Sequence, residues 1–140
     1  MKKIYRNFFS GSYQITNGIL AGFVILIFLY SAIFSPERNN YPIHSSETFI
    51  SGNYSMSTGL SRGFSSIMRL QFNKAYAYNP FSFRIFMFFL IQLLLRIFFL
   101  FYSRNSSHGE MRYIIIPDIA ISTVLFIVFF EPFWREMVRF

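Results

Sequence analysis

Three long apolar runs dominate this chain, and polar residues separate each run from the next. The runs cover residues 15–34, 81–102 and 113–130. A helix needs about 20 predominantly apolar residues to cross the roughly 30 Å hydrocarbon core of a bilayer. Helices are expected because lipid offers no partner for backbone N–H and C=O groups, and the runs lack the alternation of a barrel strand. The sequence therefore predicts an all-α integral membrane protein with three transmembrane helices.

The composition agrees with a lipid environment. Hydrophobic residues make up 54% of the 140 residues and charged residues 14%, and there are 21 Phe and 9 Tyr. Such a content of aromatic residues suits side chains that face acyl chains or the headgroup boundary. A chain of this length has room for one domain, so residues 1–140 are expected to form a single membrane domain.

The first run has a second interpretation, as the apolar part of a cleaved signal peptide, because Lys2, Lys3 and Arg6 precede it. Signal peptides have an apolar region of about 7–15 residues, followed by a cleavage site of small residues. The run is longer than this, and no such site follows it. A spanning helix is therefore the better interpretation.

The net charge of +7 would suggest a nucleic-acid partner if the protein were soluble. Here most basic residues flank the apolar runs, where they anchor helices to anionic lipid and set their orientation. The N-terminal tail has three basic residues and no acid, and Arg104 and Arg112 follow the second run. Both segments are expected on the cytoplasmic side. The prediction is a multi-pass protein with a cytoplasmic N-terminus and no nucleic-acid partner.

The residue types also limit the chemistry. The chain has no cysteine, which excludes disulfides and thiolate metal sites. Its two histidines, His44 and His108, are far apart in the sequence and lie in expected loops. We therefore expect no catalytic residue, no metal site and no cofactor.

Charged residues inside the second and third runs are the most informative signal. An ionised side chain at the centre of a span costs about 2.5–3.5 kcal/mol on insertion scales, so it usually has a partner. Arg96 and Asp118 lie at equal distances from position 107, within the short segment that joins the two runs. In an antiparallel hairpin they lie at the same depth, and Gln92 precedes Arg96 by one turn on the same face.

We interpret Arg96, Asp118 and Gln92 as a structural intramembrane pair with an added hydrogen bond, which fixes the register of the hairpin. Two alternatives stay open: the pair belongs to an ion or proton path, or Arg96 extends toward the interface. A single aspartate without a second carboxylate makes a poor proton relay, so the structural interpretation is favoured.

The segment between the first two runs contains a further helical pattern. An apolar stripe at helical spacing consists of Phe64, Ile67, Met68, Gln71, Phe72 and Ala75. The opposite side consists of Arg62, Ser65, Arg69 and Asn73. The pattern predicts one amphipathic helix over residues 62–76, interfacial or re-entrant, with Ser61 as its N-cap. Gly59 and Gly63 are expected to permit a tight turn before it. Contact with lipid headgroups or with a partner protein is expected through Arg62, Arg69 and Lys74.

The stretch "TGLSRGFSSIMRLQFNKAYAYNPFSF" resembles the signature of the DUF2752 family of small bacterial membrane proteins. In that signature a Cys-Pro-x-Cys-Gly-x-Thr-Arg motif precedes an amphipathic segment, an alanine and an Asn-Pro at the head of a transmembrane helix. The residues that match this framework are Gly59, Ser61, Arg62, Asn79 and Pro80, with Ala75 or Ala77 as the alanine. The two motif cysteines fall at Ser55 and Thr58, so no role of that cysteine pair carries over. The resemblance implies a bacterial inner-membrane location and no particular reaction.

These features favour a non-catalytic accessory or scaffold subunit of an envelope assembly, with membrane lipid and a larger membrane protein or a second copy as partners. The alternative is a lipid-acting membrane enzyme or a small oligomeric transporter, with a polar site around Arg62, Arg69, Arg96 and Asp118. A third interpretation is a membrane-bending or lipid-sensing device built on the amphipathic helix.

Overall fold

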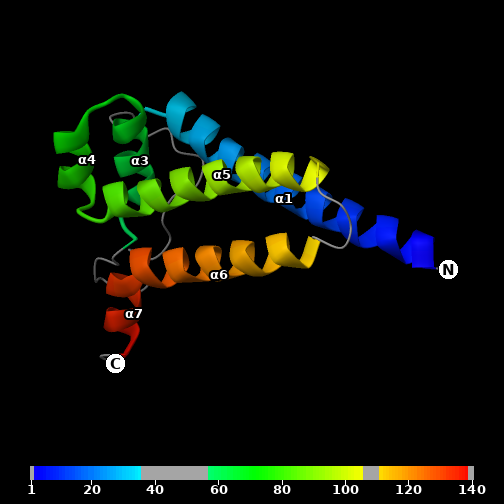
Figure 1. Ribbon diagram of the computed structural model, residues 1–140. Coiled ribbons are helices and arrows are strands. Elements are labelled where there is room, and N and C mark those ends of the chain that lie inside the picture. Colours follow the sequence, from blue (N-terminus) through cyan, green and yellow to red (C-terminus); the bar gives the residue numbers. More distant parts are fainter. Residues whose placement is uncertain (1, 36–56, 106–110, 139–140) are drawn as a thin grey trace. The chain divides into compact units, whose positions relative to one another are not determined.

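The fold is all-helical over the residues that the structure describes. The computed structural model describes residues 2–35, 57–105 and 111–138, and no strand occurs among them. In chain order the helices are α1 (Lys2–Ile33), α3 (Leu60–Met68), α4 (Phe72–Tyr78), α5 (Ser82–Asn105), α6 (Met111–Phe129) and α7 (Glu131–Val138) (Figure 1). The all-α prediction is confirmed.

Three of the helices are long and apolar enough to cross a membrane. These stretches are Gly11–Ile33, Ser82–Arg104 and Met111–Phe129, with mean hydropathies of 2.0, 2.3 and 1.9. They agree with the three predicted spans to within four residues at every end. Each carries large exposed apolar side chains, such as Ile19, Phe98 and Val124. Such helices suit contact with acyl chains. The chain is a multi-pass membrane protein.

The chain falls into two compact units, which are described separately. The first unit comprises Met1–Ile25 and Phe88–Glu131, and the second unit comprises Leu26–Met87 and Pro132–Phe140. The single membrane domain expected over residues 1–140 stays a prediction.

In the first unit, α5 runs antiparallel to both α1 and α6. Gln14 of α1 donates a hydrogen bond to the carbonyl of Ser103 on α5, and Gly18 faces Leu100. A small core lies near the α5–α6 connection and consists of Phe99, Met111 and Ile114, flanked by Tyr13, Leu95 and Ile115. An aromatic cluster follows further along the hairpin and consists of Phe88, Phe126, Phe129 and Phe130. The hairpin is therefore packed on both sides of its polar middle.

In the second unit, α3 packs closely on its neighbours because its buried face is made largely of small residues. That face consists of Gly63, Phe64, Ser65, Ser66 and Ile67. A Cβ atom on Gly63 would overlap the side chain of Ser82 at the start of α5. The Ser82 hydroxyl in turn donates to the carbonyls of Ala75 (3.1 Å) and Asn79 (2.7 Å).

The prediction of one amphipathic helix over residues 62–76 is wrong, because the chain forms two short helices there. Leu70 adopts the left-handed conformation (φ 59°) between them. The N–H groups of Leu70 and Gln71 donate to the carbonyls of Ile67 and Ser66, both at 2.9 Å. This pair of bonds is a Schellman motif, which ends a helix and normally has glycine at the left-handed position.

The break also changes which residues are covered. Ser65, which was predicted on the polar side, is completely buried. Met68, Gln71 and Phe72, which were predicted on the apolar stripe, are exposed. The turn at Leu70 ends α3, so Gln71 and Phe72 do not continue its buried face. Ser65 is covered because α3 buries five consecutive residues, from Gly63 to Ile67.

The start of α3 differs from the prediction as well. Its N-cap is Gly59 in the left-handed conformation (φ 83°), and Ser61 lies exposed within the first turn. A Cβ atom on Gly59 would overlap the carbonyl oxygen of Tyr78, so both the conformation and the close contact require glycine. Gly63 lies inside α3 and serves close packing rather than a turn.

The helix α7 was not predicted. It starts at Glu131 and has Pro132 in its first turn. An acidic side chain and a proline both suit this position, because the first-turn N–H groups have no intrahelical acceptor.

Candidate functional site

The predicted intramembrane ion pair is present in the first unit. An Nη1 of Arg96 on α5 lies 2.8 Å from Oδ2 of Asp118 on α6. Arg96 is 8% exposed and Asp118 is 1% exposed. Equal depth in an antiparallel hairpin brings the two residues together, as the sequence predicts.

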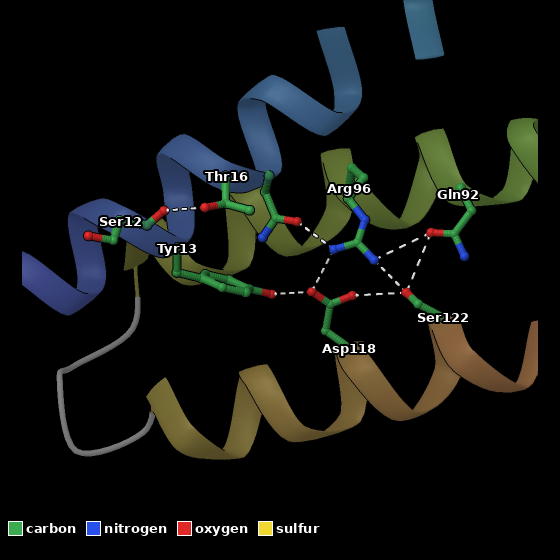
Figure 2. Close-up of polar contacts among 8 residues, drawn as sticks. Ser12, Tyr13, Thr16, Gln92, Arg96, Asp118 and Ser122 are labelled. Carbon is green, nitrogen blue, oxygen red and sulfur yellow. Dashed lines mark hydrogen bonds and ion pairs between the residues drawn. The ribbon is translucent and has the colours of Figure 1, made fainter. Parts of the chain in front are cut away.

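A third helix completes the pair. Asn17 of α1 accepts a hydrogen bond from Nη1 of Arg96 at 2.6 Å. Tyr13, one turn earlier, donates its hydroxyl proton to Oδ2 of Asp118 at 2.7 Å (Figure 2). The sequence interpretation missed both residues, and they bind the two members of the pair separately.

Two further side chains close the other side of the cluster. Nη2 of Arg96 donates to Oε1 of Gln92 at 3.3 Å and also to the hydroxyl of Ser122 (Figure 2). The Ser122 hydroxyl lies 3.4 Å from both Oε1 of Gln92 and Oδ1 of Asp118. The predicted role of Gln92 in extending the contact is therefore present. We call Tyr13, Asn17, Gln92, Arg96, Asp118 and Ser122 the polar cluster.

Each helix contributes two members of the polar cluster, four residues apart. These pairs are Tyr13 and Asn17 on α1, Gln92 and Arg96 on α5, and Asp118 and Ser122 on α6. Residues at this spacing project from one face of a helix. The same spacing of polar residues on three apolar helices was the sequence signal for the missed residues.

The charges and hydrogen bonds of the polar cluster hold α1, α5 and α6 in one register. One cation and one anion neutralise each other, and both carboxylate oxygens of Asp118 have neighbouring donors. A polar group inside hydrocarbon costs free energy unless it is hydrogen-bonded, so the contacts hold the helices in one register. Among the cluster's buried polar atoms, Nδ2 of Asn17 has no partner. The described parts of the chain contain no group of three or more His, Cys, Asp or Glu side chains that could bind a metal ion.

Two residues of the framework that carries the predicted resemblance, Gly59 and Asn79, lie close together in the second unit, because Gly59 contacts Tyr78 and Asn79 binds Thr58. Nδ2 of Asn79 donates to the carbonyl of Thr58 at 2.9 Å, and its Oδ1 accepts from the N–H of Phe81 at 2.8 Å. The asparagine therefore joins the turn before α3 to the start of α5, where Pro80 also lies. Thr58 stands at the position of the second motif cysteine, and Ser55 lies outside the described residues.

The predicted cations of this segment have different surroundings. The guanidinium carbon of Arg62 lies 6.0 Å from the centre of the Tyr78 ring. Arg69 donates to the carbonyls of Ser65 (2.8 Å), Ala32 (2.9 Å) and Ser31 (3.4 Å). Its charge therefore binds the last turn of α1, where carbonyls have no intrahelical partner. Lys74 is exposed on α4.

The four residues of the alternative polar site, Arg62, Arg69, Arg96 and Asp118, are divided between the two units. Arg96 and Asp118 belong to the first unit, whereas Arg62 and Arg69 belong to the second unit. Direct contact is present between Arg96 and Asp118.

Fold and site define an all-α membrane protein whose three apolar helices contain a buried, charged polar cluster. Comparison of the chain with family models, with curated proteins and with solved structures gave no match. The resemblance to the DUF2752 family stays a prediction.

Proposed function

We propose that this chain is a non-catalytic membrane protein that serves as an accessory or scaffold subunit of a bacterial envelope assembly. The polar cluster supports this proposal most, since Arg96 and Asp118 bind each other and are almost completely buried. A catalytic or transporting group has to reach its substrate, whereas these groups bind neighbouring helices. Their role in the proposal is to fix the helices that present the outer surface to lipid and partner.

The proposal includes contact between the segment 59–76 and lipid headgroups. The support is its place in the chain, because α4 ends at Tyr78 and the span of α5 begins at Ser82. So short a connection keeps α4 near the membrane boundary. Arg62, Arg69 and Lys74 are the cations that the proposal assigns to this boundary, whatever intramolecular contacts they also make.

The proposed location is the bacterial inner membrane, with a cytoplasmic N-terminus. The charge distribution supports this orientation, because Lys2, Lys3 and Arg6 precede the first span without an acid. Single cysteines placed in the connection at residues 40–60 provide the test, since the chain has no cysteine of its own. An impermeant thiol reagent is expected to label them in whole cells with a permeabilised outer membrane and not in inverted vesicles. The reverse labelling would contradict the orientation.

A second candidate is a lipid-acting membrane enzyme or a small oligomeric transporter, and one observation favours it. Nδ2 of Asn17 is buried beside Arg96 without a partner. An unpaired donor in such a place suits a bound water or a polar ligand group. In this candidate, the cluster binds something besides its own side chains.

Native purification of the tagged full-length chain in mild detergent separates the two candidates. The scaffold proposal expects a membrane protein partner in fixed stoichiometry. It also expects the same partner with a variant that carries Arg96→Met and Asp118→Leu, because the pair lies inside the chain and the double change leaves no unpaired charge. A chain that purifies alone with bound phospholipid would favour the second candidate. Loss of the partner from the folded double variant would place the ion pair in the interface and contradict its internal role.

A further inference from the structure

The turn between α3 and α4 exposes apolar side chains next to a strained backbone. We call residues 69–72 the α3–α4 corner. Leu70 is 76% exposed and Phe72 is 49% exposed. Leu70 also occupies the left-handed position that suits glycine or asparagine. A leucine that is strained and barely covered by its own chain indicates a contact outside the chain, since strain of this kind collects at binding sites.

The corner is tied to the ends of two membrane spans. Arg69 donates to the carbonyls of Ser31 and Ala32, in the last turn of the span that ends at Ile33. On the other side, the Ser82 hydroxyl at the start of the α5 span donates to the carbonyl of Ala75 in α4. Span ends lie at the boundary between hydrocarbon and headgroups. The corner therefore lies at that boundary, within reach of acyl chains.

The segment that contains the corner is basic, which suits an anionic membrane surface. From residue 57 to residue 87 the chain has no Asp or Glu, and its basic residues are Arg62, Arg69, Lys74 and Arg84. Cations in a segment beside a membrane attract anionic headgroups. A hollow of about 330 Å³ is lined by Leu70, Gln71, Phe72, Asn73 and Lys74. Exposed apolar side chains with Arg69 and Lys74 beside them match the upper acyl region of an anionic leaflet.

We propose that the α3–α4 corner is a bilayer anchor, in which Leu70 and Phe72 insert among acyl chains below the headgroups of an anionic leaflet. The proposal rests on the membrane location in the proposed function and deepens it. It assigns the lipid contact first to apolar side chains, with the four cations at the level of the phosphates. The left-handed conformation projects Leu70 from a turn rather than from a helix face, and this explains why a strained residue carries the contact.

Spin-label accessibility in vesicles tests the anchor. The full-length chain is reconstituted into phosphatidylcholine and phosphatidylglycerol vesicles with a nitroxide on Leu70→Cys, Phe72→Cys, Ser61→Cys or Ile19→Cys. Ile19, 67% exposed within the first span, is the lipid reference, and Ser61, exposed in the first turn of α3, is the matched polar control. The labels at positions 70 and 72 are expected to collide more often with oxygen than with a water-soluble nickel chelate, with a smaller excess than at position 19, which lies deeper in the bilayer. The label at position 61 is expected to show the opposite.

The other outcomes are also decisive. Frequent nickel collisions at positions 70 and 72 would overturn the anchor. Protection from both reagents would mean that a second copy or a partner protein covers the corner, which also overturns it. Frequent nickel collisions at position 19 would contradict the membrane location itself, so failure of the proposed function is distinguished from failure of the anchor.

A second variant tests Leu70 without unfolding the turn. Asparagine tolerates the left-handed conformation, so Leu70→Asn keeps the Schellman motif. In this background, the label on Phe72→Cys is expected to lose most of its excess of oxygen over nickel collisions, while thermal stability in detergent stays at or above that of the parent chain. An unchanged collision ratio would show that Leu70 does not hold the corner in the bilayer.

Discussion

The polar cluster of the first unit and the polar side chains of the second unit bind different kinds of partner. In the polar cluster, side chains bind other side chains, as Arg96 binds Asp118 and Asn17. In the second unit they bind backbone carbonyls, as Arg69 binds Ala32 and Asn79 binds Thr58. The backbone explains the difference. Carbonyls in the middle of a spanning helix are already paired, whereas those at helix ends and turns are not.

This difference sets the scale of the expected mutational effects. A broken contact in the first unit leaves an ion or a dipole inside a low-dielectric interior, where nothing replaces the lost partner. A broken contact at a helix end leaves a carbonyl that water or a lipid headgroup can bind. Substitutions in the polar cluster are therefore expected to destabilise the chain more than substitutions at the helix ends.

Asp118→Asn is expected to have the largest effect. It leaves the guanidinium of Arg96 buried without a counter-charge, and removal of one partner of a buried pair costs about 3–5 kcal/mol. The measurement is the free energy of unfolding in mixed micelles, followed by circular dichroism as denaturing detergent is added. The matched control is the double variant Arg96→Met with Asp118→Leu. It leaves no unpaired charge, so it is expected to recover part of the loss, while the polar side chains that bound the pair still lose their partners.

If Asp118→Asn were as stable as the parent chain, the polar cluster would not be more sensitive to substitution than the helix ends of the second unit. A double variant as unstable as the single one would mean that the polar cluster needs its hydrogen bonds rather than its charge balance. Tyr13 and Ser122 would then contribute most, because they bind the oxygens of Asp118 directly.

The sequence was sufficient to predict the ion pair but not the contacts that α1 makes with it. Arg96 and Asp118 are joined by a short connection, so counting from its midpoint gives their depth. Asn17 comes before a long segment, and neither its depth nor the rotation of its helix follows from counting. The spacing of Tyr13 and Asn17 alone marks a polar stripe on an apolar helix, and two other helices repeat this spacing.

Gly59→Ala is expected to have the second largest effect, and it tests how firmly backbone geometry holds the second unit. Residue 59 has a φ of 83°, and a methyl group there would overlap the carbonyl oxygen of Tyr78. The left-handed conformation alone costs an L-residue about 1–2 kcal/mol, so a loss of about 2 kcal/mol in unfolding free energy is expected. The matched control is Gly22→Ala, where no atom lies within 4 Å of the added methyl group. It is expected to stabilise the helix by about 0.5–1 kcal/mol. Equal effects at the two glycines would contradict the assigned geometry.

The second unit was harder to predict because its decisive features are turns and long-range caps. The expected helix over 62–76 missed the break at Leu70, since the residue type that announces a Schellman motif is absent there. The partners of Arg69 on α1 are more than thirty residues away in the sequence, and no periodicity connects them. The framework of Gly59 and Asn79 was found as a motif, and its members do meet around Thr58 and Tyr78.

Arg69→Met is expected to have the smallest effect of the three. The side chain keeps its apolar stem and loses the charged hydrogen bonds to Ala32, Ser31 and Ser65. Hydrogen bonds from a charged group contribute about 1.5–3 kcal/mol, but the end of α1 stays open to replacement donors, so a loss of about 1.5 kcal/mol is expected.

Two controls sharpen the test of Arg69. Arg69→Lys keeps the charge without the planar fork, so it is expected to recover part of the loss, because one ammonium group cannot reach several carbonyls in the same geometry. Arg112→Met removes an exposed arginine at the start of α6 and is expected to leave the unfolding free energy within about 0.5 kcal/mol of the parent value. If Arg69→Met cost as much as Asp118→Asn, the end of α1 would be as closed to water and headgroups as the polar cluster. The difference between side-chain and backbone partners would then not set the size of the effect.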